Sequence, residues 1–408
     1  MFHPRGLHAA IVIAGMLLPA TDAVALWNDR LEVFVARSIT RDDNIFRLSG
    51  ASDPVPVTGS SSTADTYRTT NLGFRFDVPV SRQRFLAEWS WNDNRYERFS
   101  ILDYTGHRGR AVWQWQAGNE LSGELGYAKT RSLASLANVQ SGVQSSTPNP
   151  VDKRDAFVNA AYMLTARWKL EGELTETRNA NAAPEFRVND LRISGTGATV
   201  SYVSPADNEV GVNLRVAEAR YPVQLPVAGN LIDNAYRQQN LALFTHWTIT
   251  ARSRLGAQLG RVERSYSQLP QRDFERTTFR AAYEWRATAK LTLTADAQND
   301  ISEIEEINTG YVFARGVALR SAFRLSEKID IGGAFEYSDR DYLGEPGLVF
   351  GTVQPRNDRV RAIAISASWR PLRSVWLDAN ARRETRSSSA AFGDYAVNIF
   401  GLTAGIRF

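Results

Sequence analysis

The feature of this sequence that most constrains its fold is a repeated alternation of apolar and polar residues. In the stretch "RFLAEWSWN", Phe85, Ala87, Trp89 and Trp91 alternate with Arg84 and other polar residues. Successive side chains of a β-strand point to opposite faces, so a period of two indicates strands rather than helices. The same period recurs in segments 110–116, 121–127, 209–216, 279–286 and 290–298.

The strands are joined by connectors that are alternately short and long, which is typical of outer-membrane barrels. We count nine hairpins and therefore predict an all-β, transmembrane, up-and-down antiparallel barrel of about 18 strands. A count of 16 stays open, because segment 83–116 can be divided differently. We expect strands of about 9–11 residues, short periplasmic turns and long extracellular loops. Long connectors lie near 41–66, 131–153, 221–235 and 343–356.

The composition agrees with alternating lipid-facing and lumen-facing residues. The chain has 10 Trp and 19 Phe beside 48 Lys+Arg and 44 Asp+Glu, and no run of 18 apolar residues that would form a membrane helix. Several tryptophans fall at or near strand ends, as an interfacial aromatic girdle requires. They are Trp89, Trp91, Trp113, Trp115, Trp247, Trp285 and Trp369. The net charge of +4 is small, and we expect no nucleic-acid partner.

The first 25 residues read as a secretory signal peptide. Arg5 precedes an apolar run at 9–18, and Ala23-Val24-Ala25 forms a small-residue cleavage pattern. A buried N-terminal helix is the alternative. We predict cleavage near Ala25, a single barrel domain at 26–408 without a preceding plug domain, and an integral location in the outer membrane of a Gram-negative cell. The chain has no cysteine, which excludes disulfides and thiolate metal sites.

Candidate catalytic groups are few, so we predict no enzymatic activity, no cofactor and no metal site. Outside the signal peptide the only histidines are His107 and His246. A serine–histidine–acid site acting on lipid or polysaccharide would need one of them beside a serine, and no local motif supports it. The acidic segment 301–306 is expected to be a solvated loop, with a bound divalent cation as the alternative.

Inward-facing charges are the strongest functional signal. Arginine outnumbers lysine, and its planar guanidinium can bind a carboxylate through two hydrogen bonds. Such a lumen would suit anionic sugar chains, although Arg–Glu pairs that brace the barrel wall would give the same pattern. The candidate residues along the solute path are Arg110, Glu124, Arg215, Arg280, Glu284, Arg320, Arg324, Asp378 and Arg382.

One motif supports a family resemblance. The stretch "RSITRDDNIFRLS" at 37–49, the Trp113–Trp115 pair and the "LSGELGY" that follows resemble the EpsL-type outer-membrane barrels associated with exopolysaccharide biosynthesis. The resemblance implies a barrel that helps a polysaccharide cross the outer membrane, with periplasmic export or scaffold proteins as partners. From the residues alone, Asp and Asn favour a turn, and sugar or cation contact at the loop-side mouth is the alternative. The motif residues are Asp42, Asp43, Asn44 and Arg47.

Our leading hypothesis is therefore a passive conduit for exopolysaccharide export. The alternatives are a general or anion-selective porin for small solutes, a barrel enzyme, and an adhesion barrel that uses the loops at 131–153 and 343–356.

The last strand carries a closure signal. Alternation places the apolar residues of this strand toward lipid and Arg407 toward the lumen. The strand also needs a partner, because an open sheet edge cannot persist in hydrocarbon. We expect this strand to pair with the first strand, near Leu31 to Ile39, and to be read by the barrel assembly machinery, in contact with lipid and lipopolysaccharide. The residues assigned to closure and assembly are Phe400, Leu402, Ile406 and Phe408.

Overall fold

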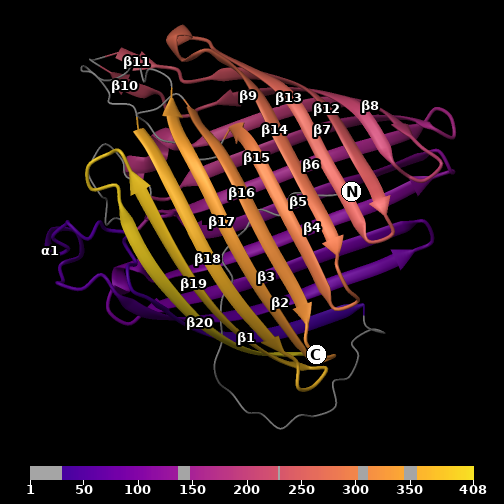
Figure 1. Cartoon of the computed structure of the whole chain (residues 1–408). Coiled ribbons are helices and arrows are strands. Elements are labelled where there is room, and N and C mark those ends of the chain that lie inside the picture. Colours follow the sequence, from indigo (N-terminus) through magenta and orange to yellow (C-terminus); the bar gives the residue numbers. More distant parts are fainter. Residues whose placement is uncertain (1–29, 137–147, 228–229, 302–310, 344–355) are drawn as a thin grey trace.

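The chain folds into one closed antiparallel barrel. A computed structural model describes residues 30–136, 148–227, 230–301, 311–343 and 356–408. Eighteen strands form a single sheet in which every strand is hydrogen-bonded to two neighbours (Figure 1). The predicted transmembrane barrel fold is confirmed, with 18 strands rather than 16.

The barrel strands follow one another in chain order, and each connects to the next at alternating ends of the barrel. Short turns lie at one end, which we call the turn end, and the longer connections lie at the other, the loop end. The strands are β1 (Leu31–Asp42), β2 (Asp65–Val80), β3 (Gln83–Tyr96), β4 (Tyr104–Ala117), β5 (Leu121–Leu133), β6 (Pro150–Met163), β7 (Trp168–Asn181), β8 (Leu191–Val203), β9 (Glu209–Arg220), β12 (Tyr236–Thr250), β13 (Ser253–Tyr266), β14 (Phe274–Arg286), β15 (Leu291–Ile301), β16 (Tyr311–Arg324), β17 (Ile329–Leu343), β18 (Arg356–Trp369), β19 (Val375–Ser388) and β20 (Tyr395–Arg407).

The loop end carries small elements that were expected to be plain loops. The hairpin of β10 (Leu225–Val227) and β11 (Asn230–Ile232) lies within the predicted loop 221–235, and α1 (Val55–Thr58) within the loop 41–66. Segments of three or four residues give no periodic signal, so alternation could not find them. Within the described ranges, no helix has both the length and the apolar character needed to cross a membrane. Three 3₁₀ turns lie at Ser100–Leu102, Pro184–Asn189 and Pro270–Arg272.

The strands are longer than the predicted 9–11 residues. They range from 11 residues in β15 to 16 in β2. The additional residues at the loop end carry exposed charges, for example Arg68 on β2, whose guanidinium pairs with Glu97. The expected length covered only the part of each strand that crosses hydrocarbon. The hydrogen-bonded ladders continue beyond it.

The first strand also extends further than predicted. It was expected to end near Ile39, with the motif at 37–49 following it. Instead β1 continues to Asp42, which pairs with Asp65 on β2 and with Ile399 on β20. Backbone pairing on both sides therefore outweighs the turn preference of Asp and Asn until residue 42.

Several predictions concern residues outside the described ranges. The signal peptide at 1–25 lies in the undescribed segment 1–29, and the acidic segment 301–306 lies almost wholly in 302–310. The proposed adhesion loops at 131–153 and 343–356 include the undescribed segments 137–147 and 344–355.

Closure of the barrel depends on pairing between the first and last strands. Nine residue pairs join β1 to β20, from Phe34–Arg407 to Asp42–Ile399, and β1 and β20 lie side by side in Figure 1. Phe408 continues this ladder, since its N–H donates to the Val33 carbonyl at 2.8 Å and its carbonyl accepts from the Val33 N–H at 3.1 Å. The predicted pairing of the last strand with the first is confirmed. We call this boundary the seam.

We predict that deleting Phe408 lowers the yield of folded barrel severalfold. The deletion removes both hydrogen bonds between Val33 and the last residue and so shortens the ladder that closes the sheet at the turn end. Phe408→Ala keeps the backbone pair and should fold better than the deletion. Folded protein is measured as the heat-modifiable band on gels. Phe392→Ala, at an exposed loop aromatic, is the control, and equal yields for all variants would contradict the prediction.

Candidate functional site

The two faces of the barrel wall differ in chemistry. On β18 the outward residues Ile363, Ile365 and Trp369 are 59%, 64% and 47% exposed, whereas the alternate positions carry Ser366 and Ser368. In a transmembrane barrel the apolar exposed face contacts lipid and the polar face lines the lumen. By register, inward residues are even-numbered on β1, β3–β5 and β12–β19, and odd-numbered on β2, β6–β9 and β20.

The outward face carries the aromatic residues expected of a girdle. Trp91, Trp113, Trp247, Trp285 and Trp369 are all exposed on it. Trp89 is also outward, but its indole ring lies against the backbone of Gly109, where a Cβ atom would come within 1.9 Å of the ring. Trp115 is outward as well. Trp89 and Trp115 were also predicted to be girdle residues, and both are of intermediate exposure.

The structure places all nine predicted solute-path residues on the inward face. They do not converge on one point, since they are spread over β4, β5, β9, β14, β16 and β19. The structure brings together two of them, Arg320 and Arg382, through a shared contact with Glu336. Their role in solute passage stays a prediction.

A chain of ion pairs crosses the inner wall from β15 to β20. Arg320 pairs with Asp296 on β15 and lies 3.9 Å from Glu336 on β17. Arg382 on β19 reaches Glu336 at 3.0 Å and Glu384 at 2.7 Å. The chain ends on β20, where the Tyr395 hydroxyl donates to Glu384 at 2.7 Å. Alternation could not identify this network, because it depends on which strands are neighbours.

Most other inward charges are also compensated. Lys169 contacts Glu209 at 2.6 Å, and Arg215 lies 3.7 Å from Glu173. Arg280 pairs with Asp300, Arg286 lies 3.3 Å from Glu284, and Arg324 lies 3.9 Å from Asp330. On the strands as described, inward cations and inward carboxylates are nearly equal in number. Paired bracing of the wall, which the sequence left open, therefore accounts for most of the arginines.

A few inward arginines have no ion-pair partner among the described residues. Arg108 and Arg110 occupy successive inward positions on β4 and are exposed, and Arg254 is exposed on β13. These guanidiniums give the lumen local positive charge without making it cationic as a whole.

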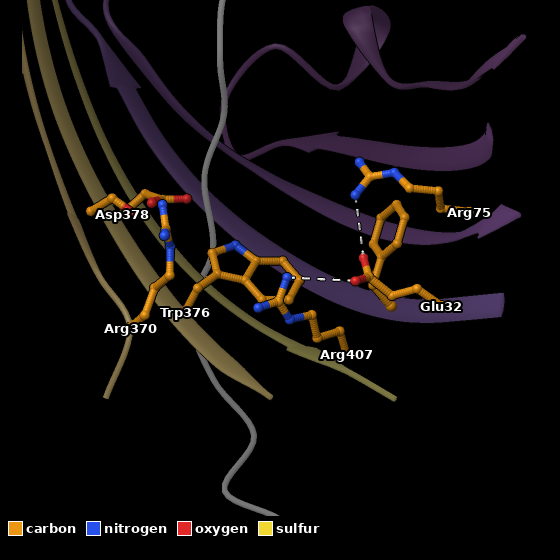
Figure 2. A pocket seen from close by; sticks show the side chains of 8 residues that line it. Glu32, Arg75, Arg370, Trp376, Asp378 and Arg407 are labelled. Atoms are coloured by element: carbon orange, nitrogen blue, oxygen red, sulfur yellow. Dashed lines mark hydrogen bonds and ion pairs between the residues drawn. The ribbon is translucent and has the colours of Figure 1, made fainter. Parts of the chain in front are cut away.

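At the turn end, the seam forms a recess on the inner wall. Its volume is about 340 Å³, and it lies where β1, β2, β19 and β20 meet the end of β18 (Figure 2). The Trp376 ring covers Gly405, where a Cβ atom would come within 2.1 Å of the ring. The Phe34 ring meets the Trp376 ring edge-on, with the two centroids 6.5 Å apart. Gly405 therefore allows the indole to lie flat on the wall. The recess is lined by Glu32, Phe34, Arg75, Ser368, Arg370, Trp376, Asp378 and Arg407.

Charged groups surround the aromatic pair. Glu32 lies 3.5 Å from Arg407 and 3.6 Å from Arg75, as the dashed lines in Figure 2 show. Arg370 reaches Asp330 at 2.9 Å, and Asp378 lies on the same side of the recess. An aromatic face flanked by guanidinium donors and carboxylate acceptors can bind hydroxyl- and carboxylate-bearing solutes. Of this set the sequence analysis had named Asp378 as a solute-path residue and Arg407 as lumen-facing. It did not identify Trp376, which stands between Val375 and Leu377, where alternation is ambiguous.

The loop-mouth motif forms a structural clamp at the seam. Arg47 holds the buried Asp42 through two contacts, of 3.0 and 2.8 Å. Asn44 donates to the carbonyls of Leu48 and Ala396, at 2.8 and 3.1 Å. Burial alone would lower the pKa of Arg47, but the charge and hydrogen bonds of Asp42 more than offset it and raise that pKa.

Asp43 completes this clamp. It accepts hydrogen bonds from the backbone N–H and the side-chain amide of Asn398 on β20, each at 2.7 Å. The turn interpretation of the motif thus fits its contacts better than sugar or cation binding.

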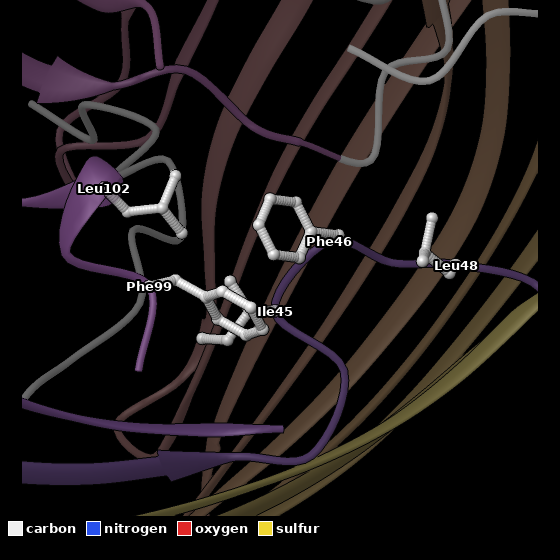
Figure 3. Close-up of a cluster of buried hydrophobic side chains, with 5 residues drawn as sticks. All are labelled: Ile45, Phe46, Leu48, Phe99 and Leu102. Atoms are coloured by element: carbon white, nitrogen blue, oxygen red, sulfur yellow. The ribbon is translucent and has the colours of Figure 1, made fainter. Parts of the chain in front are cut away.

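A small hydrophobic core stabilises the same loop. Ile45, Phe46 and Leu48 pack with Phe99 and Leu102 of the next connection (Figure 3). The rings of Phe46 and Phe99 meet edge to face, with centroids 4.9 Å apart. Tyr67 and Tyr96, on inward positions of β2 and β3, pack against this core, so the loop covers the inner wall at the loop end.

The two histidines lie on opposite faces of the barrel wall. His246 is inward, with its Nδ1 atom 3.8 Å from Glu209, and the nearby Ser201 side chain is fully buried. His107 is outward and stacks on Trp89 at 5.6 Å. No group of three or more potential metal ligands occurs among the described residues.

Comparison with known proteins supports the porin fold. The sequence model of a family described as "Putative beta-barrel porin 2" matches residues 250–408, which contain β13–β20. The crystal structure of Pseudomonas aeruginosa OccK2 (OpdF) is 12% identical, covers 93% of this chain and 98% of its own, and superposes with a TM-score of 0.52. The complex of OccK2 with glucuronate superposes with a TM-score of 0.51 at 12% identity, covering 93% and 99%.

No curated protein matches this sequence. The chain therefore has the fold of outer-membrane porins. The family match is to a porin family and not to the EpsL-type family that the motif at 37–49 resembles.

We predict that Arg47→Leu lowers the free energy of unfolding by roughly 3 kcal/mol, because it leaves the buried Asp42 carboxylate without its cation. The measurement is the midpoint of chemical denaturation. Arg68→Leu is the matched control: its pair with Glu97 is 51% and 46% exposed and should be worth about 1 kcal/mol or less. Equal shifts for both variants would contradict the clamp.

Proposed function

We propose that this protein is an integral outer-membrane porin that passively admits small hydrophilic solutes. The observation that carries the proposal is a closed 18-strand barrel with a polar, charged inner wall and an apolar outer wall. The family match at residues 250–408 supports the same function. Outer-membrane barrels have short turns on the periplasmic side and long loops on the extracellular side. The turn end of this barrel would therefore face the periplasm, and the loop end would face the cell exterior.

The charge balance of the inner wall favours weak ion selectivity. Rings of like charge select ions, and this wall instead alternates guanidinium and carboxylate groups in pairs. Arg108 and Arg110 add local attraction for anions on β4. We therefore expect a modest preference for anions.

The recess at the seam indicates the solute class. Trp376 offers an aromatic face, and Arg75, Arg370 and Arg407 offer donors around it. Sugars and sugar acids combine an apolar ring face with hydroxyl or carboxylate groups, which match these partners. OccK2, which shares the fold, crystallised with glucuronate, and that agrees with a sugar acid as a solute.

Exopolysaccharide export is the second candidate, and it rests on the sequence resemblance. The residues that carry the resemblance, including Asp42, Asp43 and Arg47, make contacts within the loop and with β20. These contacts explain the motif through barrel closure and do not favour polymer transport.

Planar-bilayer recordings of the purified full chain separate the two candidates. A porin should give steady conductance steps in salt, with glucuronate causing brief, concentration-dependent block. A polysaccharide conduit should be closed at rest, or blocked durably by long oligosaccharides and not by single sugars. A closed channel would overturn the porin proposal.

We predict that Trp376→Ala and Arg407→Gln each weaken glucuronate block about tenfold, the effect of losing one strong contact. Steady conductance should change by less than about twofold, because the wall itself is intact. Trp369→Ala, on the lipid-facing side of β18, is the matched control. Unchanged block in both recess variants would exclude the recess as the binding site.

A further inference from the structure

The outward face of the seam carries a group of arginines. Arg41 on β1, Arg361 on β18 and Arg383 on β19 occupy outward positions and are exposed. Arg359 occupies the next outward position of β18 toward the loop end. We call Arg41, Arg361 and Arg383 the outer arginine patch.

The strand register places these three side chains near one another. Arg361 lies opposite Thr385, two residues from Arg383, and such diagonal neighbours are about 7–8 Å apart. Arg383 lies opposite Asn398 on β20, and Arg41 lies opposite Phe400 on the same strand. Two strand spacings, about 10 Å, therefore separate β19 from β1. Long guanidinium side chains can converge across this distance.

The patch lies at the upper edge of the lipid-facing apolar surface. Toward the turn end the outward positions carry Ile363 and Ile365 on β18 and Phe400 and Leu402 on β20, all exposed. Arginine on the lipid face of a barrel is costly at mid-bilayer and tolerated near the interface. A place on the loop side of this surface is where lipid headgroups are expected. Arg37, a further exposed outward arginine on β1, lies nearer the turn end, opposite Ala404.

Arginines on other outward strand ends are mostly paired with carboxylates. Arg68 contacts Glu97, and Arg131 lies 3.2 Å from Asp152. Further outward pairs are Arg95–Asp93, Arg178–Glu176, Arg192–Glu176, Arg220–Glu218, Arg261–Glu275 and Arg315–Asp341.

The patch arginines have no such partner among the described residues. Arg383 donates only to the side-chain oxygen of Asn398, at 3.1 Å. The neighbouring carboxylate, Asp43, already accepts two hydrogen bonds from Asn398. Three guanidiniums without a carboxylate partner among the described residues can take anions from outside the chain.

We propose that the outer arginine patch binds the phosphate groups of a phosphorylated glycolipid of the outer leaflet, the lipid part of lipopolysaccharide. Guanidinium binds phosphate through paired, charge-assisted hydrogen bonds, which lysine cannot reproduce. The acyl chains of the lipid would lie against Ile363, Ile365, Phe400 and Leu402. Bound lipid would thereby cover the seam from outside, where the sheet closes.

The test measures lipid binding to the folded full chain in detergent by native mass spectrometry. The probes are diphosphorylated lipid A, dephosphorylated lipid A and inorganic phosphate. The triple variant Arg41→Gln, Arg361→Gln, Arg383→Gln should bind diphosphorylated lipid A at least about tenfold more weakly, and dephosphorylated lipid A should bind both proteins weakly. Arg237→Gln, an exposed outward arginine on β12, is the matched control and should bind like the parent.

Each outcome decides the proposal. Unchanged binding in the triple variant, or equal binding of phosphorylated and dephosphorylated lipid, would overturn it. Displacement of the lipid by equimolar inorganic phosphate would show a free-anion site and overturn the lipid assignment. If the triple variant does not fold, the single variants Arg361→Gln and Arg383→Gln replace it, each with an expected loss of severalfold. Arg361→Lys should lose part of this affinity, and full retention would contradict guanidinium recognition.

Discussion

Closure of the sheet between β1 and β20 is the interaction on which the rest of the structure depends. In hydrocarbon every backbone N–H and carbonyl needs a partner, so a sheet with two free edges cannot span a bilayer. Nine residue pairs and the Phe408–Val33 hydrogen bonds join the chain's two distant ends. The clamp of Asp42 with Arg47, and of Asp43 with Asn398, secures the same boundary at the loop end.

Once the sheet is closed, alternation assigns every strand residue to water or to lipid. The inner wall becomes a network of compensated charges, and the recess beside Trp376 is its most distinctive feature. The outer wall over the same strands becomes an apolar surface bordered by Arg41, Arg361 and Arg383. The seam therefore combines three properties in one place: backbone closure, a polar recess inside the barrel and a cationic patch outside it.

The sequence was sufficient for the properties that depend on near neighbours in the chain. The barrel fold, the 18 strands and the inward direction of residues such as Arg110 and Arg382 follow from local alternation. The contacts of those residues do not. The Arg382–Glu336 pair and the Trp376 ring over Gly405 each join two strands that the register places together, and the Asp43–Asn398 bonds join the first loop to the last strand. Strand ends were also missed, because β1 continues to Asp42 through backbone pairing despite its turn-favouring residues.

The most direct test of this account is a single-cysteine scan along β18, from Asp358 to Trp369, in the assembled protein in lipid vesicles. The chain has no cysteine of its own, so the reaction measured in each variant comes from the single introduced thiol. We expect a period of two: even-numbered positions should react with a hydrophilic thiol reagent, except where the side chain is buried. Odd-numbered positions from 363 to 369 should react only with a lipid-soluble one. Reaction with the hydrophilic reagent at both parities between 363 and 369, or with no period there, would contradict a closed barrel with a water-filled lumen.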